Sequence, residues 1–347
     1  MNKSAPGRSS SGHLTVSVVV ITYNGARHIV DQIESIIGQT RAPDEIIISD
    51  DASNDDTVER ARSTLGSWHG RSQLRTARRN AGVSANLQGG LAVATGDVIM
   101  LADQDDIWLP QRVERQTSVI EKDPSVAAVF CDADLVDADG HAVGARLWER
   151  EGFSAKQRRI WAHDPATVLL GGQVVTGATL AFRRELLDIV LPLPANGWHD
   201  SWIALMTVFS GGEMIAVPEP LLSYRLHGDN AAGVPPPTWR SKLGAALWPG
   251  GGDLAQLSEA VERLERGAVG GASGDVEPLV DRLKRVRDFY VSRRRLDPRL
   301  WRRAPRIARW WFQGEYSCCR SGFRSAAADL AVAGIRSRHE SDVAPER

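Results

Sequence analysis

The chain contains the apolar run Val98-Ile99-Met100-Leu101-Ala102, followed directly by Asp103-Gln104-Asp105-Asp106. The apolar run is typical of a strand that is buried on both faces of a parallel sheet. Three carboxylates in four residues repel one another at the end of such a strand, and a divalent cation would neutralise them. A polar turn that caps the next helix is the alternative, because Asp is also a favourable N-cap residue.

Around this strand, apolar β-branched runs alternate with segments of helical spacing. Strands are expected at 16–21, 45–49, 73–76, 98–102 and 126–131. Helices are expected at 29–37, 57–65, 83–95 and 109–121. Strands that alternate with helices predict an α/β fold, in which a parallel sheet is covered by helices on both faces.

Polar residues follow three of these strands at the point where each strand ends. They are Thr22-Tyr23-Asn24, Asp50-Asp51 and the acidic run from Asp103. Ligands of parallel α/β sheets bind at the carboxyl ends of the strands. Turn chemistry explains any one of these groups. Three groups at one edge of the sheet favour a cleft for a nucleotide and a metal ion.

The second half of the chain has a different pattern. We expect an acidic, turn-rich connector at 132–140, a helix at 183–189, a helix opened by Trp198-His199-Asp200-Ser201-Trp202 and a strand at 221–227. A Gly/Pro-rich linker at 228–237 predicts a domain boundary, and two helical stripes after it predict a helical hairpin. The predicted organisation is a disordered leader (1–13), a large α/β domain (14–235), a basic helical region (240–335) and a tail (336–347).

Composition narrows the class of protein. The net charge is −1, but residues 282–324 hold fourteen Lys or Arg against three Asp or Glu. A nearly neutral chain whose larger α/β domain is acidic is not expected to bind nucleic acid. Three cysteines form neither a disulfide framework nor a metal-ligand spacing, which favours the cytoplasm. No secretory signal is evident, and no window approaches the roughly twenty apolar residues of a membrane helix.

Four motifs in order carry a resemblance to a known family. Residues 18–57 resemble the nucleotide-binding half of family 2 glycosyltransferases, and Asp103-Gln104-Asp105-Asp106-Ile107-Trp108 resembles the aspartate motif of their rhamnosyltransferase-like branch. His199-Asp200-Ser201-Trp202 and Tyr224-Arg225-Leu226-His227-Gly228-Asp229-Asn230 resemble two later motifs of that branch. The resemblance covers about residues 14–235 and departs from the family pattern at Ala52 and Asp229. It implies the GT-A fold, with a mostly parallel, Rossmann-like sheet covered by helices, here followed by a C-terminal helical appendage.

The resemblance also implies roles on the donor side. Asp105 would bind Mn²⁺ or Mg²⁺, Asp103 would contact the ribose or a water on the metal, and Asp51 would accept N3–H of the pyrimidine of a dTDP- or UDP-sugar. Further nucleotide contacts would come from Thr22, Tyr23, Asn24, Asn80 and Gly82. His227 would approach the metal or the diphosphate. An Asx-turn for Asp51, loop geometry for Asn80 and Gly82, and a structural role for His227 are the alternatives.

On the acceptor side, the resemblance implies that Asp200 is the general base, because inverting transfer needs one group to take the proton of the attacking hydroxyl. A helix N-cap is the alternative role for Asp200. The pocket for donor and acceptor would be completed by Gly177, Trp198, His199, Trp202 and Arg225, with Arg225 directed at phosphate oxygens.

The sequence thus predicts a metal-dependent inverting glycosyltransferase that moves a sugar, with rhamnose as a candidate, to a surface glycan or glycolipid. A metal-dependent nucleotidyltransferase and a non-catalytic scaffold that binds glycan or membrane are the alternatives. The basic C-terminal region is either a solvated helical face or a patch at the inner face of the membrane. In the second case Arg293-Arg294-Arg295, Arg302-Arg303, Trp310 and Trp311 would face anionic lipid.

Overall fold

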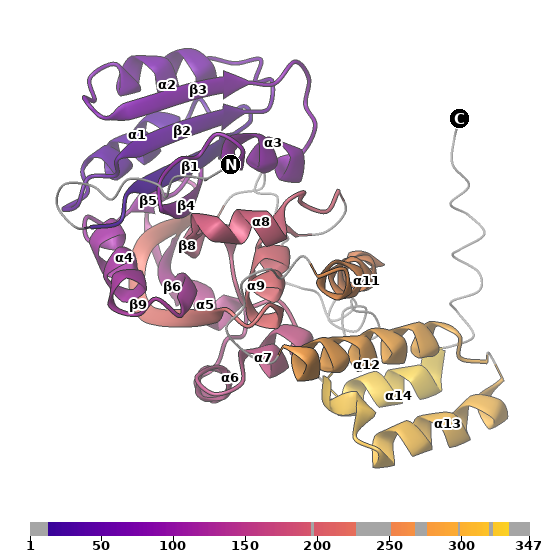
Figure 1. Ribbon diagram of the computed structural model, residues 1–347. Helices are drawn as coiled ribbons and strands as arrows, with labels where there is room; N and C mark the ends of the chain where they lie inside the picture. The colour runs from indigo at the N-terminus through magenta and orange to yellow at the C-terminus, as the bar shows by residue number, and fades with distance from the viewer. Residues whose placement is uncertain are drawn as a thin grey trace.

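The computed structural model describes residues 13–195, 198–226, 251–267, 276–297, 299–318 and 322–332. One twisted sheet runs through the molecule, helices cover both of its faces, and further helices extend from one side (Figure 1). The sheet order is β3-β2-β1-β4-β8-β6-β9-β5, with β7 paired to β6. The expected α/β fold is therefore confirmed.

The first half of the sheet is parallel. It consists of β1 (Val16–Thr22), β2 (Glu45–Asp50), β3 (Arg71–Thr76) and β4 (Val98–Asp103). Thr22 is in register with Asp50, and Ile21 is in register with Asp103. The three polar groups that follow β1, β2 and β4 therefore meet at one edge of the sheet.

Alternating strand residues explain how the helices are distributed. The helices of this half are α1 (Ile29–Ile37), α2 (Thr57–Leu65), α3 (Val83–Leu91) and α4 (Arg112–Lys122). Val18 and Val20 share a core with apolar side chains of α1, α2 and α4, whereas Val19 packs in a second core with α3. Successive side chains of a strand point to opposite faces, so one buried strand serves both cores.

The second half of the sheet is mixed, and it differs from the expectations in four places. The strands are β5 (Ile107–Trp108), β6 (Val126–Val136), β7 (Ala142–Arg146), β8 (Leu180–Arg183) and β9 (Glu213–Arg225). The expected connector at 132–140 is instead the end of β6 and a hairpin turn into β7. In the segment 183–189, expected to be one helix, Arg183 ends β8, and the 3-10 helix η2 (Arg184–Leu186) and the short α-helix α8 (Leu187–Val190) follow. The helix expected from residue 109 begins at Arg112, because residues 107–108 pair with β9. The strand expected from 221 begins at Glu213.

Short helices link the strands of the second half. They are α5 (Leu147–Arg150), α6 (Ala155–Trp161), α7 (Pro165–Gly171), η1 (Gly177–Thr179) and α9 (His199–Phe209). Phe130 of β6 lies at the centre of an aromatic cluster with Trp148, Phe153 and Trp161, with ring centroids 5.0–5.6 Å away. This packing fixes α5 and α6 against the sheet.

The C-terminal helices extend the same core. α11 (Gly251–Glu265) and α12 (Glu277–Arg294) pack on each other, and Leu257, Val261 and Leu283 join the core that contains α9. Beyond them, α13 (Leu300–Phe312), η3 (Glu315–Cys318) and α14 (Gly322–Val332) form a smaller cluster around Phe289 and Tyr316 (Figure 1). The residues proposed as leader, linker and tail lie almost entirely outside the described residues, so these domain limits stay predictions. None of the described helices is both long and apolar enough to cross a bilayer.

Candidate functional site

The ends of β1 and β2 are joined to a loop at residues 80–82. The Thr22 hydroxyl donates to Asp50 Oδ1 at 2.9 Å. Asp51 is buried, and its two carboxylate oxygens accept the backbone N–H groups of Ala81 at 2.9 Å and Gly82 at 2.8 Å. Gly82 has a φ of +88°, a conformation that favours glycine. The Asp51 carboxylate thus holds the start of α3 at the carboxyl edge of the sheet.

A glutamine links the loop after β1 to the acidic turn after β4. The Tyr23 N–H donates to Gln104 Oε1 at 2.9 Å, and Gln104 Nε2 donates back to the Tyr23 carbonyl at 3.1 Å. A Cβ on Gly25 would collide with the Gln104 amide, so a larger residue here would displace that side chain. Asn24 adopts a φ of +49° and accepts the Asn54 N–H at 3.0 Å. Tyr23 is 44% exposed at this edge, which leaves its ring available to a ligand.

The acidic turn is a concentration of negative charge in a buried place. Asp105 and Asp106 are buried, and Oδ2 of Asp106 has no hydrogen-bond partner within the described residues. Burial and the negative charges of Asp105 and Asp200 raise the pKa of Asp103 to about 7. Burial and the charges of Asp105 and Asp103 also raise the pKa of Asp106 well above its usual value. The turn therefore holds carboxylates whose ionised forms lack sufficient compensation from the protein.

Two arginines lie near this turn, and one of them bonds to it directly. The N–H of Arg225 donates to Asp106 Oδ1 at 3.1 Å, and its Nε donates to the Asp105 carbonyl at 2.8 Å. Arg112 stacks over Trp108 at 3.8 Å, and burial lowers the pKa of its guanidinium to about 10. Asp106 therefore bonds to β9 and does not cap α4, whose N-cap residue is Gln111. Arg225 holds the backbone of the turn through its main-chain and side-chain donors.

The carboxylate oxygens of the acidic turn are suitable ligands for a divalent metal ion. Carboxylate oxygens are ligands for Mg²⁺ and Mn²⁺, and Mg²⁺ is commonly held by one or two carboxylates together with substrate phosphates. The partnerless oxygen of Asp106 and the raised pKa of Asp103 are both features that a cation at this turn would relieve. His227, the other predicted metal ligand, lies outside the described residues.

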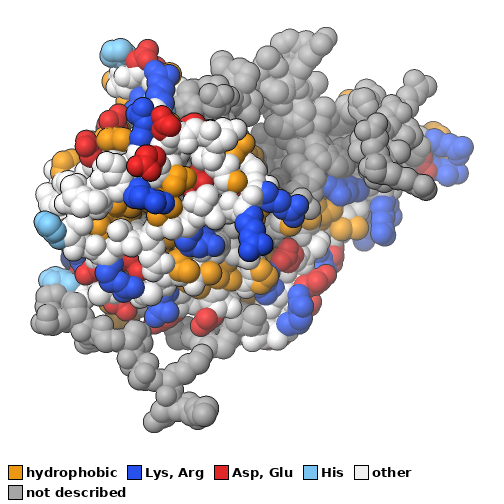
Figure 2. Space-filling view, turned by 90° about the horizontal axis from the view of Figure 1, so that it is seen from above, with side chains coloured by type: hydrophobic (Ala, Val, Ile, Leu, Met, Phe, Trp, Pro, Cys, Tyr) orange, Lys and Arg blue, Asp and Glu red, His pale blue; other side chains and the backbone are white. Residues whose placement is uncertain are grey.

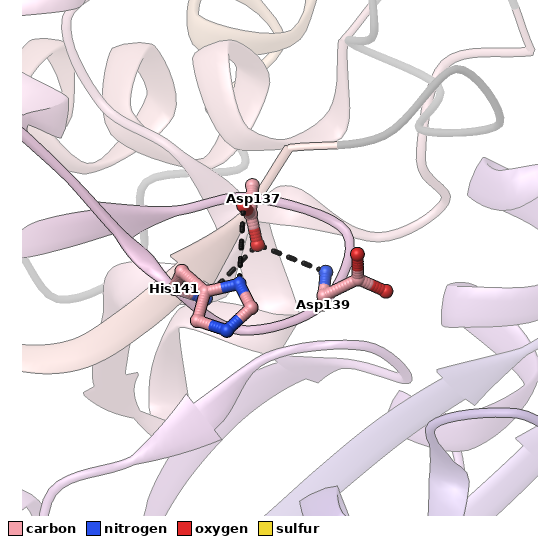
Figure 3. A group of neighbouring side chains, drawn as sticks. All are labelled: Asp137, Asp139 and His141. Atoms are coloured by element: carbon pink, nitrogen blue, oxygen red, sulfur yellow. Dashed lines mark hydrogen bonds and ion pairs between the residues drawn. The ribbon is translucent and has the colours of Figure 1, made fainter.

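A second group of acidic and histidine side chains lies elsewhere, close enough together to hold a metal ion. Among the described residues, Asp137, Asp139 and His141 alone bring three candidate ligand atoms within 4.8 Å of one another (Figure 3). They lie in the turn between β6 and β7, where Asp137 Oδ1 accepts the N–H groups of both Asp139 and His141 at 2.9 Å. Asp139 also pairs with Arg27 at 2.8 Å. These contacts are those of an exposed Asx-type turn, so we assign no metal to it.

Asp200 lies in a cradle of hydrogen-bond donors at the start of α9. Gln173 Nε2 donates to both carboxylate oxygens at 3.0 Å, and the Gly177 N–H donates to Oδ2 at 3.2 Å. The helix begins at His199 with Trp198 as its N-cap residue, so an N-cap role for Asp200 was the wrong alternative. Asp200 is buried, and its charge acts on Asp103. The carboxylate of α9 therefore shares one electrostatic site with the turn after β4.

The other predicted pocket residues lie in three different environments. His199 packs directly on Gly177, where a Cβ would lie 2.6 Å from its Nε2, and burial lowers the pKa of its imidazole. Trp198 is 45% exposed, and its carbonyl accepts Gln256 Nε2 of α11 at 2.9 Å. Trp202 is a core residue whose indole N–H donates to the Val190 carbonyl at 2.8 Å.

Asn80 is exposed, and its Oδ1 accepts the Gly82 N–H at 3.2 Å. Three residues of the site were missed by sequence reasoning: Gln104, Gln173 and Arg112. Gln104 lies between Asp103 and Asp105, so its place in the acidic run could have marked it as a residue of the site. Nothing in the sequence around Gln173 or Arg112 marks either residue.

Comparison with known proteins agrees with this geometry. Residues 17–188 match the family model described as glycosyl transferase family 2. This part of the chain, just under half of its length, is therefore similar to that family. An uncharacterised glycosyltransferase of Nostoc sp. is 29% identical over 62% of this chain and 66% of its own length. An uncharacterised protein of Mycobacterium tuberculosis is 26% identical over 61% of this chain and 59% of its own length. The chain thus matches just under two thirds of the length of these relatives.

Solved glycosyltransferase structures share the GT-A fold of this chain. The mannosyltransferase PcManGT of Pyrobaculum calidifontis, in complex with GDP-Man and Mn²⁺, has a TM-score of 0.52 and 20% identity over 95% of this chain and 88% of its own. TarS of S. aureus, in complex with UDP-GlcNAc, has a TM-score of 0.54 and 15% identity over 94% of this chain and 92% of its own. The rhamnosyltransferase-like branch is not distinguished by these similarities.

Proposed function

We propose that this protein is a metal-dependent inverting glycosyltransferase that uses a dTDP- or UDP-sugar. One observation carries the proposal: buried Asp200, fixed by Gln173, acts electrostatically on Asp103 in the acidic turn after β4. A base for the acceptor and carboxylates for the donor's metal ion must meet at the same anomeric carbon. The family match of residues 17–188 and the GT-A fold support the same reaction.

The donor would lie along the carboxyl edge of β1, β2 and β4. Asp51 keeps acceptor capacity beyond the two N–H groups that it holds, because a carboxylate offers about four lone-pair sites. It could therefore accept N3–H of a pyrimidine. Tyr23 presents an exposed ring beside it, and Thr22, Asn24, Asn80 and Gly82 shape the backbone there. Asp103 would contact the ribose.

Asp105, with Asp103 and Asp106 beside it, would hold Mn²⁺ or Mg²⁺ against the diphosphate. The ion would supply charge compensation for the leaving nucleoside diphosphate. Arg225 fixes the backbone of this turn, so we assign it to support of the turn and not to direct contact with phosphate. His227 remains the proposed further ligand of the metal or the diphosphate.

The acceptor side would use Asp200 as the general base. The acceptor hydroxyl oxygen attacks the anomeric carbon while its proton passes to the Asp200 carboxylate. The bond from that carbon to the diphosphate oxygen breaks, and the electron pair leaves with the nucleoside diphosphate. Attack from the face opposite the leaving group inverts the configuration. Gln173 and the Gly177 N–H orient the carboxylate, and exposed Trp198 offers a face on which a sugar ring could stack.

The motifs shared with the rhamnosyltransferase-like branch make rhamnose the first candidate for the transferred sugar. The acceptor would be a surface polysaccharide or a lipid-linked glycan of the cell envelope. We place the reaction in the cytoplasm, because a buried free Cys131 and sparse cysteine overall fit a reducing compartment.

A panel of nucleotide sugars tests this proposal. Thermal shifts with dTDP-, UDP- and GDP-sugars, each with and without Mn²⁺ or Mg²⁺, should identify one donor class whose stabilisation needs the metal. A ligand at about a hundred times its Kd should add about 2.7 kcal/mol. Acceptor-dependent release of nucleoside diphosphate from that donor supports glycosyl transfer. Release of pyrophosphate from a nucleoside triphosphate and a sugar phosphate would instead identify a nucleotidyltransferase.

A further inference from the structure

Helix α13 has an unusual distribution of side chains. The side that packs on the protein carries Arg303, Ile307 and Trp310, with Ile307 buried and Trp310 in edge contact with Phe289 at 5.3 Å. The buried Arg303 donates to the Leu330 carbonyl of α14 at 2.6 Å. Arg303 and Trp310 therefore cannot face a membrane as the sequence predicted, because both belong to the inner side.

The opposite side of α13 carries an apolar stripe exposed to solvent. Trp301, Pro305, Ala308 and Phe312 are spaced i, i+4, i+7 and i+11, which places them on one face of a helix. Trp301 is 68% exposed and Phe312 is 88% exposed. An amphipathic helix of a globular protein normally buries its apolar stripe, so this one is oriented the other way.

Basic side chains border the stripe, and acidic ones are absent from this helix. Arg302, Arg306 and Arg309 are exposed and lie side by side next to the stripe. Arg302 also stacks on Trp301 at 4.7 Å and makes a long contact of 3.4 Å with Asp297. On the face of the molecule seen in Figure 2, acidic and basic side chains are interspersed.

A second aromatic pair extends the same end of the helix. Trp311 is 45% exposed and meets Phe323 of α14, which is 73% exposed, with ring centroids 6.1 Å apart. In Figure 1, α13 is the outermost of the C-terminal helices, with α14 and α12 between it and the sheet. Contacts with α14 and η3 hold it in place. The exposed side is therefore presented by a supported helix.

We propose that the outer side of α13, formed by Trp301, Pro305, Ala308 and Phe312 with Arg302, Arg306 and Arg309, docks on the surface of an anionic lipid membrane. The charges are complementary, since clustered arginines attract acidic headgroups and no carboxylate of this helix opposes them. Trp and Phe are side chains that insert at the level of the headgroups. This inference goes beyond glycosyl transfer and does not depend on it.

Vesicle flotation with the full chain tests the proposal. The probes are vesicles of phosphatidylcholine alone and of phosphatidylcholine mixed with phosphatidylglycerol, without donor, acceptor or metal. We expect binding to the anionic vesicles that weakens as salt rises to physiological strength. R302Q/R306Q/R309Q should lower the partition coefficient by about 100-fold, from about 1 kcal/mol per charge. W301S/F312S should lower it by roughly tenfold or more through lost apolar contact.

Two control variants test whether binding depends on the arginines of α13 or only on the net charge of the protein. R302K/R306K/R309K keeps the charges and should keep binding. R60Q/R62Q/K156Q removes three exposed charges from α2 and α6 and should bind as wild type. Melting curves confirm that each variant is folded.

Equal binding to neutral vesicles, or equal loss in R60Q/R62Q/K156Q, would overturn the proposal. So would sedimentation velocity that finds a dimer broken by W301S/F312S, because the stripe would then belong to a second copy. Transfer activity is measured separately on a soluble acceptor, so either proposal can fail without the other.

Discussion

Both carboxylate oxygens of Asp200 accept a hydrogen bond from the side-chain nitrogen of Gln173, each at 3.0 Å. Gln173 lies between α7 and η1, and Asp200 lies in the first turn of α9, so the pair joins two segments of the proposed acceptor side. This carboxylate is held by one amide group, by the Gly177 N–H and by the Ser201 N–H at 2.7 Å, so its orientation is fixed. The orientation of the proposed base therefore depends in part on a residue 27 positions earlier in the chain.

Gln173→Met keeps the size of the side chain and removes the donor. We expect kcat to fall roughly 10- to 100-fold, since a hydrogen bond to a charged group contributes about 1.5–3 kcal/mol. KM for the donor sugar nucleotide should stay nearly constant, because Gln173 contacts the base and not the donor. Steady-state kinetics of nucleoside diphosphate release measure both values. The same substitution at exposed Gln313 is the control, and a change in donor KM alone would contradict the positioning role.

Asp200→Asn removes the proton acceptor but preserves the shape of the site. Transfer should fall by about 10²–10⁴-fold, the usual contribution of a general base. Donor affinity, measured by calorimetry, should be unchanged. Asp188→Asn, an exposed change nearby in the chain, should behave as wild type. If Asp200→Asn loses donor binding, then Asp200 belongs to the nucleotide site.

Asp105→Asn removes one charge from the acidic turn. Nucleotide binding should lose its dependence on Mn²⁺, and activity should fall by orders of magnitude, because a neutral amide is a poorer ligand for a hard cation. Titration of nucleoside diphosphate with and without Mn²⁺ measures the effect. Full activity of wild type in EDTA, or normal metal dependence in the variant, would remove the proposed metal role.

The pH dependence of stability should report Asp103. Its pKa is raised from 3.8 to about 7, so between these values the folded state holds a proton that the unfolded state releases. The free energy of unfolding without metal should therefore decrease as pH rises from about 4 to about 7, as far as this group is concerned. Asp103→Asn should make this decrease shallower. Denaturant unfolding across the pH range measures it.

Divalent metal supplies the control for that pH effect. Mn²⁺ or Mg²⁺ should raise the melting temperature more at about pH 8, where Asp103 is ionised, than at about pH 5.5. Equal stabilisation at both pH values would mean that the ion does not bind the acidic turn.

Arg293→Met should destabilise the C-terminal helices. Arg293 donates to Asp329 from Nε at 2.7 Å and from Nη2 at 3.1 Å, and both residues are buried. Removing one partner of a buried pair costs about 3–5 kcal/mol, because the other charge stays buried. Arg294→Met, at an exposed neighbouring position, should change stability by less than about 0.5 kcal/mol. Urea denaturation compares the two, and equal effects would refute a structural role for the pair.

Local patterns alone determined the first half of the fold. The β-branched runs at 16–21 and 45–49 and the apolar run at 98–102 are buried strands, because continuous apolar segments of this length can only be covered on both faces. Their polar ends were correctly expected at one edge, since parallel strands bring their carboxyl ends together. The helix at 57–65 was also correct to the residue.

Tertiary structure decided what local patterns cannot contain. The short β5 exists because Ile107 and Trp108 pair with Leu222 and Ser223, more than a hundred residues later, and this pairing delays α4 to Arg112. Gln173 reaches Asp200 only because α7 packs on α9. On α13, the side that carries Arg303 is the buried one, and the Arg303 side chain donates a hydrogen bond to the Leu330 carbonyl of α14. Sequence spacing determines which residues share a helix face, but only the surrounding contacts determine which face meets the protein and which meets its surroundings.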